Sequence, residues 1–439
     1  MTELRWLWSR LNANYWFYPA IFAVGAAVLA FAMIWLDRAG FAQRLNQVEW
    51  LMPARPTGAS DMLTVIAGSM IGVASTVFSI TIAAVAYASG NYGPRLLTNF
   101  MEDRGNQFSL ATFIGTFVYA VVVLRSVRAE GEAAATADNG VPTILPGFVP
   151  QLSLLVAFAL MGLSVAVLVF FLNHIPASIR INTVLQGIGK RLLTDIRNDY
   201  PARATGVDEL PAPEGRAVRA KTAGYIQLID YDDLAKVVGK HHCRVALEVR
   251  TGDFVHPGLP LARLCSEEAD DALADGVREA FSIGASRTPA QDPQFLIDEL
   301  VEIGMRALSP GINDPFTAIT ALHWLGAATA ELGQRDLRQR TDTEDFDLRR
   351  VLPLADDFEH FLKRGFGAIR GSVATNRLAS LVMLDALRHA ACVIEDERRQ
   401  RLLRREGDRL LEQARLALQG PDLQEIEARH VRFTQALGA

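Results

Sequence analysis

The residues best suited to chemistry lie in the stretch "ALSPGINDPFTA", where helix breakers and polar caps interrupt two helical patterns. Asn313 or Asp314 is suited to cap the second helix, and Pro315 suits its first turn. Backbone amides at a helix start attract anions, and Arg287 or Arg306 would add positive charge. The stretch predicts a corner between two helices, with the alternative of a corner that also binds an anion or ligand.

No known catalytic or metal-binding pattern supports an enzyme. The chain contains no P-loop, no G-x-G-x-x-G, no H-E-x-x-H and no G-x-S-x-G. His241, His242 and Cys243 are adjacent, whereas a zinc site needs spaced ligands. Glu302 and Arg306 lie four residues apart and are expected to pair. We predict no catalytic residue, metal or cofactor; an enzyme would need a convergent polar pocket around the stretch.

Composition indicates a membrane part followed by a soluble part. Half of the 439 residues are hydrophobic and the mean hydropathy is +0.15. The apolar residues concentrate before about position 175, and most charges follow it. A net charge of −5 argues against nucleic-acid binding, which needs excess Lys and Arg. The three scattered cysteines form no C-x-x-C pair and suit a reducing compartment.

Four apolar segments are long enough to cross a bilayer: residues 15–36, 62–88, 108–124 and 152–172. An even number of spans puts both termini on one side. The Lys and Arg residues of the connecting segments show a modest bias that favours cytoplasmic termini. The predicted fold is therefore an α-helical transmembrane bundle of four spans over residues 1–175, followed by a cytosolic α+β region.

The cytosolic region divides into three predicted parts. Residues 176–216 contain a basic juxtamembrane helix, lying along or leaving the membrane, and then a Pro- and Gly-rich linker. Residues 217–268 hold short alternating segments such as "GYIQLI" and "RVALEVR", which predict a small β-sandwich-like module. Residues 269–439 show helical periodicity with Asp-Pro starts, which predicts a helical domain.

The second span carries small residues at helical spacing: Gly68, Gly72, Ser75 and Ser79. Such a stripe lets helices approach closely. It also suits the lining of a pore, where hydroxyls meet water, and the two interpretations agree if helices pack around an oligomer axis. No Asp, Glu, Lys or Arg lies deep in a span, which weakens a proton-coupled transporter and favours a passive pore or a plain anchor.

Two polar residues at the membrane boundary are candidates for gating or lipid contact. Arg95 precedes "LLTNFM", a short amphipathic segment that predicts an interfacial elbow or a gating elbow at a pore mouth. Its guanidinium would pair with a lipid phosphate or a helix end. His174 follows the fourth span, where a lone histidine is usually an interfacial polar group, with a metal-binding or pH-sensitive role as the alternative.

Several stretches resemble the bacterial predicted membrane proteins of domain-of-unknown-function family 2254. The resemblance covers nearly the whole chain, and "RTPAQDPQFLIDELVEIGMRALSPGINDPFTA" is its most specific part. Other matching stretches are "YASGNYGPRLLTNFMEDRGNQFSLATFIGTFVYAVVVLR", "FLNHIPASIRINTVL", "GDFVHPGLPL" and "IRGSVATN". The resemblance implies a bacterial inner-membrane protein and supplies no activity or catalytic residue.

These observations predict a homo-oligomeric inner-membrane protein, with a channel-like or transport-like pore near the second span. The soluble region would sense or gate, and the partners would be membrane lipids and further copies of the chain, with an ion or small solute as the permeant. The alternative is a membrane-anchored binding or scaffold module without a pore.

Overall fold

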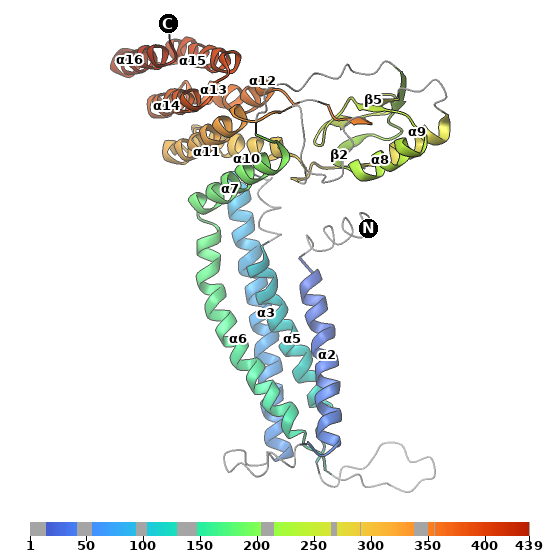
Figure 1. Cartoon of the computed structure of the whole chain (residues 1–439). Coiled ribbons are helices and arrows are strands. Elements are labelled where there is room, and N and C mark those ends of the chain that lie inside the picture. The colour runs from blue at the N-terminus through green and yellow to red at the C-terminus, as the bar shows by residue number, and fades with distance from the viewer. Residues whose placement is uncertain are drawn as a thin grey trace. The chain divides into compact units, whose positions relative to one another are not determined.

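We describe the protein from a computed structural model (Figure 1). It describes residues 15–41, 55–93, 103–129, 147–202, 215–264, 270–289, 291–337, 350–354 and 356–438. The chain forms two compact units. The first unit comprises residues 1–90 and 94–180, and the second comprises residues 91–93 and 181–439.

The first unit contains four long apolar helices: α2 (Phe17–Arg38), α3 (Pro56–Tyr92), α5 (Arg104–Leu124) and α6 (Gln151–Ser178). All four are long and apolar enough to cross a membrane, so the four predicted segments form helices that are candidates for membrane spans. α3 has 37 residues and is longer than predicted at both ends. At ~1.5 Å per residue it exceeds a hydrocarbon core of roughly 30 Å, so it tilts or extends beyond the core.

Hydrogen bonds made by side chains tie three of these helices together. The buried carboxylate of Asp37 in α2 accepts two backbone N–H groups from the first turn of α6, at 2.9 and 3.0 Å. It also accepts the hydroxyl of Ser153 at 2.7 Å. Tyr119 of α5 donates to the carbonyl of Ser153, and Thr116 of α5 lies 3.0 Å from the Ser164 hydroxyl of α6. These bonds satisfy polar groups that lipid cannot satisfy.

The second unit begins with a β module of two small sheets. The strands are β1 (Arg216–Arg219), β2 (Gly224–Ile229), β3 (Val245–Leu247), β4 (Phe254–Val255), β5 (Pro260–Leu264), β6 (Phe281–Gly284) and β7 (Val351–Leu352). One sheet has the order β1-β5-β3-β7, with β3 and β7 parallel, and the other has the antiparallel order β4-β2-β6.

Two helices, α8 (Tyr231–Lys240) and α9 (Asp271–Glu279), share the hydrophobic core of these sheets. Asp230 caps α8 by accepting the N–H of Asp233. Because β6 pairs with β2 and β7 pairs with β3, the module extends beyond the predicted end at residue 268. The sandwich-like arrangement of its strands stays a prediction.

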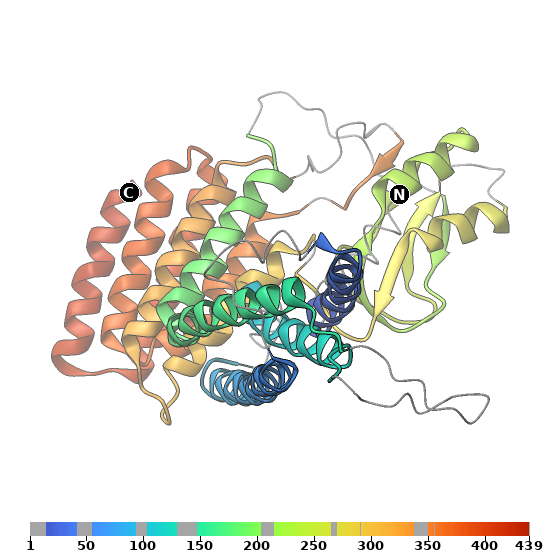
Figure 2. The same cartoon turned by 90° about the horizontal axis from the view of Figure 1, so that it is seen from below.

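A helical region follows and confirms the predicted helical C-terminal part. Its helices are α10 (Pro293–Ala307), α11 (Pro315–Gly333), α12 (Phe358–Leu362), a π-helical turn (Lys363–Gly367), α13 (Ala368–Val373), α14 (Arg377–Val393), α15 (Glu397–Ala417) and α16 (Gly420–Ala436). α11 packs on α14, which packs on α15 and α16. The orange and red helices lie side by side in Figure 2.

Helix α7 (Ile181–Asp199) packs against α10 and α11. Its apolar face is buried in this contact and consists of Leu185, Ile188, Leu192 and Ile196. A helix is therefore present in the segment predicted to be juxtamembrane, and its apolar side is covered by protein. Gly189 makes the contact close, since a Cβ there would lie 2.1 Å from the Trp324 ring of α11.

Helices α7 and α11 run in the same direction. Gly189 of α7 contacts Trp324 of α11. About two turns further along each helix, Arg197 pairs with Glu331 at 2.9 Å. The two helix starts therefore lie at the same end of the second unit.

Replacing Gly189 tests this contact. We expect Gly189→Ala to lower the free energy of unfolding by about 1–3 kcal/mol, because the new methyl group overlaps the Trp324 ring. Gly187→Ala is the matched control in the same helix, where a Cβ meets nothing within 4 Å; it should be neutral or stabilising. Thermal unfolding of the full-length protein in detergent, followed by tryptophan fluorescence, measures both. Equal midpoints would contradict the packing.

Candidate functional site

The small residues predicted in the second span lie on one exposed face of α3, here called the α3 stripe: Gly68, Gly72, Ser75 and Ser79. At 3.6 residues per turn this face is opposite the buried face that carries Leu63, Met70 and Val77. A Cβ at either glycine would meet nothing within 4 Å. The Ser79 hydroxyl donates to the Ser75 carbonyl at 2.9 Å, so it is satisfied within its own helix.

His174 has a partner that the sequence analysis did not identify. Its Nε2 lies 2.9 Å from Oδ2 of Asp103, the residue that caps α5 by accepting the N–H of Gly105. The imidazole also stacks on Phe170, with 5.1 Å between ring centroids. The structure therefore makes His174 a link between α6 and the start of α5. The other gating candidate, Arg95, lies outside the described residues.

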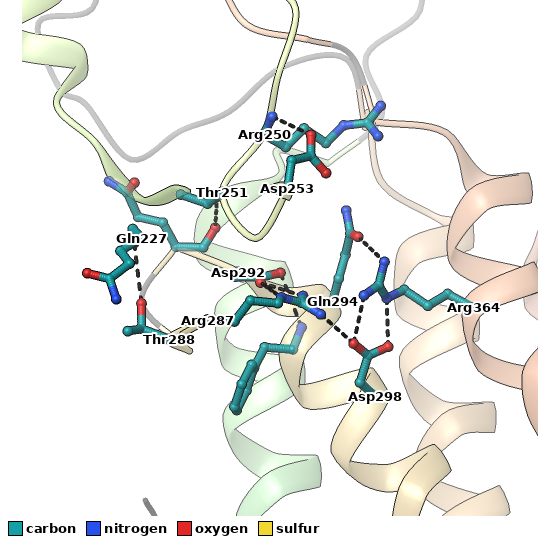
Figure 3. Close-up of polar contacts among 12 residues, drawn as sticks. Gln227, Arg250, Thr251, Asp253, Arg287, Thr288, Asp292, Gln294, Asp298 and Arg364 are labelled. Atoms are coloured by element: carbon teal, nitrogen blue, oxygen red, sulfur yellow. Dashed lines mark hydrogen bonds and ion pairs between the residues drawn. The ribbon is translucent and has the colours of Figure 1, made fainter. Parts of the chain in front are cut away.

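A cluster of charged residues in the second unit is drawn in Figure 3 and is here called the charged node: Arg287, Asp292, Asp298 and Arg364. Arg287 donates to Asp292 at 2.5 Å and to Asp298 at 2.6 Å. Arg364 forms a bidentate pair with Asp298, at 2.6 and 2.7 Å. Two guanidinium groups thus balance two carboxylates in a charge-assisted network.

Three separate segments position the charged node. Arg287 lies in the connection between β6 and α10, and Asp292 caps α10 by accepting the N–H of Phe295. Asp298 projects from α10 itself, and Arg364 comes from the π-helical turn. The Arg287 and Asp292 side chains are only 10% and 2% exposed. Because lone buried charges are costly, each pair holds its segments together, and the node joins the β module to the helical region.

The node shifts the ionisation of its carboxylates. Burial alone would raise the pKa of Asp298, but hydrogen bonds and charges from Arg364 and Arg287 outweigh it and hold the pKa below its ordinary value. At the edge of the node, burial and the charges of Arg250 and Arg364 lower the pKa of His360. Asp292 responds in the opposite direction, because its burial outweighs the hydrogen bonds and charges of Arg287 and Arg364 and raises its pKa above the ordinary value.

A tight turn of the β module approaches the node through Gly252. This residue has a φ of +89°, and a Cβ there would lie 2.2 Å from Oδ2 of Asp292. The neighbouring Thr251 hydroxyl donates to the Gln291 carbonyl at 2.6 Å. Gln291 in turn accepts the N–H of Ile229 through its side chain. These contacts connect the turn, strand β2 and the start of α10.

The stretch "ALSPGINDPFTA" forms the corner between α10 and α11. Asp314 caps α11 by accepting the backbone N–H groups of Phe316 and Thr317, both at 3.2 Å, and the Thr317 hydroxyl at 2.6 Å. Asn313 precedes it with a φ of +50° and an exposed side chain. The polar residues of the stretch thus have structural roles that local sequence rules predict.

The structure does not bring together all the residues proposed for an anion site at this corner. Arg306 is near it and lies 3.6 Å from Glu302, which confirms that predicted pair. Arg287 belongs to the charged node at the opposite end of α10, a helix of 15 residues that spans about 22 Å. Its guanidinium is engaged by two carboxylates there, so it is too far away to assist Asn313 or Asp314.

Sequence reasoning missed Arg364 and Asp103 because nothing local identifies them. Arg364 meets Asp298 across 66 residues of chain, and Asp103 meets His174 across 71. The residues Arg287, Asp292 and Asp298 are close in sequence, and one positive and two negative charges around an Asp-Pro helix start were the available signal.

The fold and these sites define a class of protein: a membrane protein with four apolar helices and a second unit of small sheets and packed helices. The chain belongs to the family described as predicted membrane protein DUF2254, whose sequence model matches residues 12–389. This confirms the family that the sequence resembles.

Two similar relatives are uncharacterized proteins of Mycobacterium bovis and Mycobacterium tuberculosis. Each is 32% identical to this chain over 293 residues, which cover 64% of this chain and 54% of the relative. The chain therefore spans about half the length of the curated relatives it matches. No solved structure matches the chain.

The charged node makes a pH-dependent contribution to stability. At neutral pH we expect Asp298→Asn to destabilise the protein by about 3 kcal/mol or more, because it leaves Arg287 and Arg364 without a full counter-charge. A carboxylate with a lowered folded pKa contributes stability above its unfolded pKa of about 4 and loses it as the pH falls through the folded value. The difference between wild type and variant should therefore narrow below about pH 4.

The control for this variant is Glu397→Gln, which breaks an exposed pair with Arg401. It should change the free energy of unfolding by less than about 1 kcal/mol at every pH. Wild type and both variants are compared by thermal unfolding of the full-length protein between pH 3 and pH 8, at intervals of about one pH unit. A constant difference between Asp298→Asn and wild type across this range would contradict the assignment.

Alanine substitutions at Gly252 and Gly258 separate the cost of backbone strain from the cost of contact with the charged node. Gly252 and Gly258 both have positive φ, +89° and +93°, but a Cβ at Gly258 meets nothing within 4 Å. Both Ala variants should lose roughly 1–2 kcal/mol through strain. Gly252→Ala should lose more, because its methyl group displaces the Asp292 carboxylate. The unfolding midpoints of the two variants measure the difference in stability loss. Equal midpoints would show that the turn at Gly252 does not contact the charged node closely.

Proposed function

We propose that the protein is a homo-oligomer of the bacterial inner membrane, whose copies meet along the α3 stripe and enclose a channel-like or transport-like path. The observation that supports this most directly is the exposed row of small residues opposite the buried face of α3. Small residues allow backbones to approach, which is how membrane helices associate without a hydrophobic driving force.

The chemistry of the stripe suits a helix contact around a polar path. Gly68 and Gly72 leave backbone accessible on this face, and Ser75 and Ser79 add hydroxyl groups to it. Hydroxyls that bond to their own helix tolerate lipid or protein, and they can also turn toward water in a pore. A path lined this way would pass an ion or small solute passively, because the stripe itself contains no ionisable residue.

In this proposal the second unit senses or gates from the cytoplasm, where both termini also lie. α3 carries the stripe and continues as one helix to Tyr92. Residues 91–93 cluster with the second unit, in which a Cβ on Gly93 would lie 2.6 Å from the Glu302 carboxylate. A rearrangement of the second unit would therefore act on the stripe through a continuous helix.

A substitution on the stripe tests the assembly. We expect Gly72→Leu to shift the protein toward the monomer, because a large side chain prevents close approach of two α3 helices. The matched control is Gly162→Leu in α6, which is also exposed and also has open space around its Cα. Mass photometry of both variants in lipid nanodiscs measures the oligomeric state. A monodisperse wild-type monomer would overturn the proposal.

Flux measurements test the path itself. Wild-type protein in liposomes should pass ions or small solutes under voltage, tension or pH steps, and Gly72→Leu should reduce the flux while Gly162→Leu retains it. An oligomer without flux under any of these conditions would instead favour the membrane-anchored binding or scaffold module.

A further inference from the structure

The corner between α10 and α11 exposes three large apolar side chains, here called the apolar corner: Met305, Ile312 and Phe316. They are 42%, 43% and 71% exposed. Pro310 and Gly311 between them are exposed as well. The carboxylate of Asp314 at this corner is held by three hydrogen bonds in the α11 cap.

The place of the apolar corner in the second unit indicates what covers it. α7 and α11 run in the same direction, with Gly189 against Trp324 and Arg197 paired with Glu331. Ile181, the first residue of α7, therefore lies at the same end of the unit as Phe316, near the start of α11. The chain reaches Ile181 directly from α6, which ends at Ser178 and is apolar enough to cross a membrane.

We propose that the apolar corner inserts into the headgroup and upper acyl region of the bilayer. Side chains such as Phe, Met and Ile gain by leaving water at this depth. Two features favour insertion over a chance exposure. The α6 tether keeps the corner near the bilayer at high effective concentration. The prolines and the Asp314 cap hold the corner rigid, so little ordering is lost on insertion.

The insertion accounts for residues of "SPGINDPF" that capping leaves without a role. Pro310 and Gly311 end α10 and Asp314 starts α11, whereas the side chains of Ile312 and Phe316 are exposed and take no part in these caps. Leu416 and Val431, exposed apolar residues of α15 and α16, lie two helix layers away and provide comparison positions. The inference holds whether or not copies of the chain enclose a path.

Lipid quenching of a fluorescent label tests the insertion in the full-length protein. Cys265→Ser and Cys392→Ser leave Cys243, which is buried, as the remaining cysteine. Phe316→Cys and Ile312→Cys are then labelled with bimane in lipid nanodiscs. Leu416→Cys is the control, since Leu416 is 89% exposed. One quencher is a phospholipid with a nitroxide near the head of its acyl chain, and the other is aqueous iodide.

We expect the nitroxide lipid to quench labels 312 and 316 and iodide to quench them weakly, with the reverse at 416. The emission of labels 312 and 316 should also shift to shorter wavelength. Strong iodide quenching without lipid quenching at 316 would overturn the proposal. Protection from both quenchers would overturn it too, in favour of a protein surface, and loss of that protection on dilution into empty nanodiscs would identify a second copy.

Discussion

The close packing of α7 on α11 is the contact on which the arrangement of the second unit depends. It exists because Gly189 has no side chain, which lets the Trp324 ring lie where a Cβ would be. The contact buries the apolar face of an otherwise basic helix and sets the direction of α7 relative to α11. That direction decides which end of the unit the chain reaches from α6. An amphipathic helix next to an apolar span can equally lie on lipid, but here the apolar face of α7 packs on protein, and Gly189 lets it pack closely.

The charged node holds the small β module against the helical region. The module has seven short strands, and two of them, β6 and β7, lie after residue 268, the predicted end of the module. Hydrophobic burial alone gives little orientation, whereas a bidentate guanidinium-carboxylate pair accepts only a narrow geometry. Arg287 and Asp292 lie on the connection that leaves the module, and Asp298 and Arg364 lie in the helical region. The desolvated pairs therefore specify an orientation more than they add stability.

The sequence predicted those features that depend on neighbouring residues. Four apolar helices, the Asp caps of α10 and α11, and the pair of Glu302 with Arg306 all follow from local spacing. Contacts between segments that are far apart in the sequence could not be predicted from it. Neither the partner of Asp298 in the π-helical turn nor the pairing of β7 with β3 leaves a local pattern. The α3 stripe was visible from spacing, but its exposure depends on which face the other helices bury.

The first unit shows why α3 differs from the spans around it. α2, α5 and α6 exchange side-chain hydrogen bonds through Asp37, Ser153 and Tyr119, and such bonds resist separation in lipid. The hydroxyls of α3 at Thr64, Thr76, Ser79 and Thr81 instead return to the carbonyl four residues earlier. α3 is held by apolar packing on one face and presents small residues on the other. Leu63, Ile66 and Val77 of α3 belong to the same buried cluster as residues of α2, α5 and α6, so burial of this apolar face decides that the α3 stripe is left exposed.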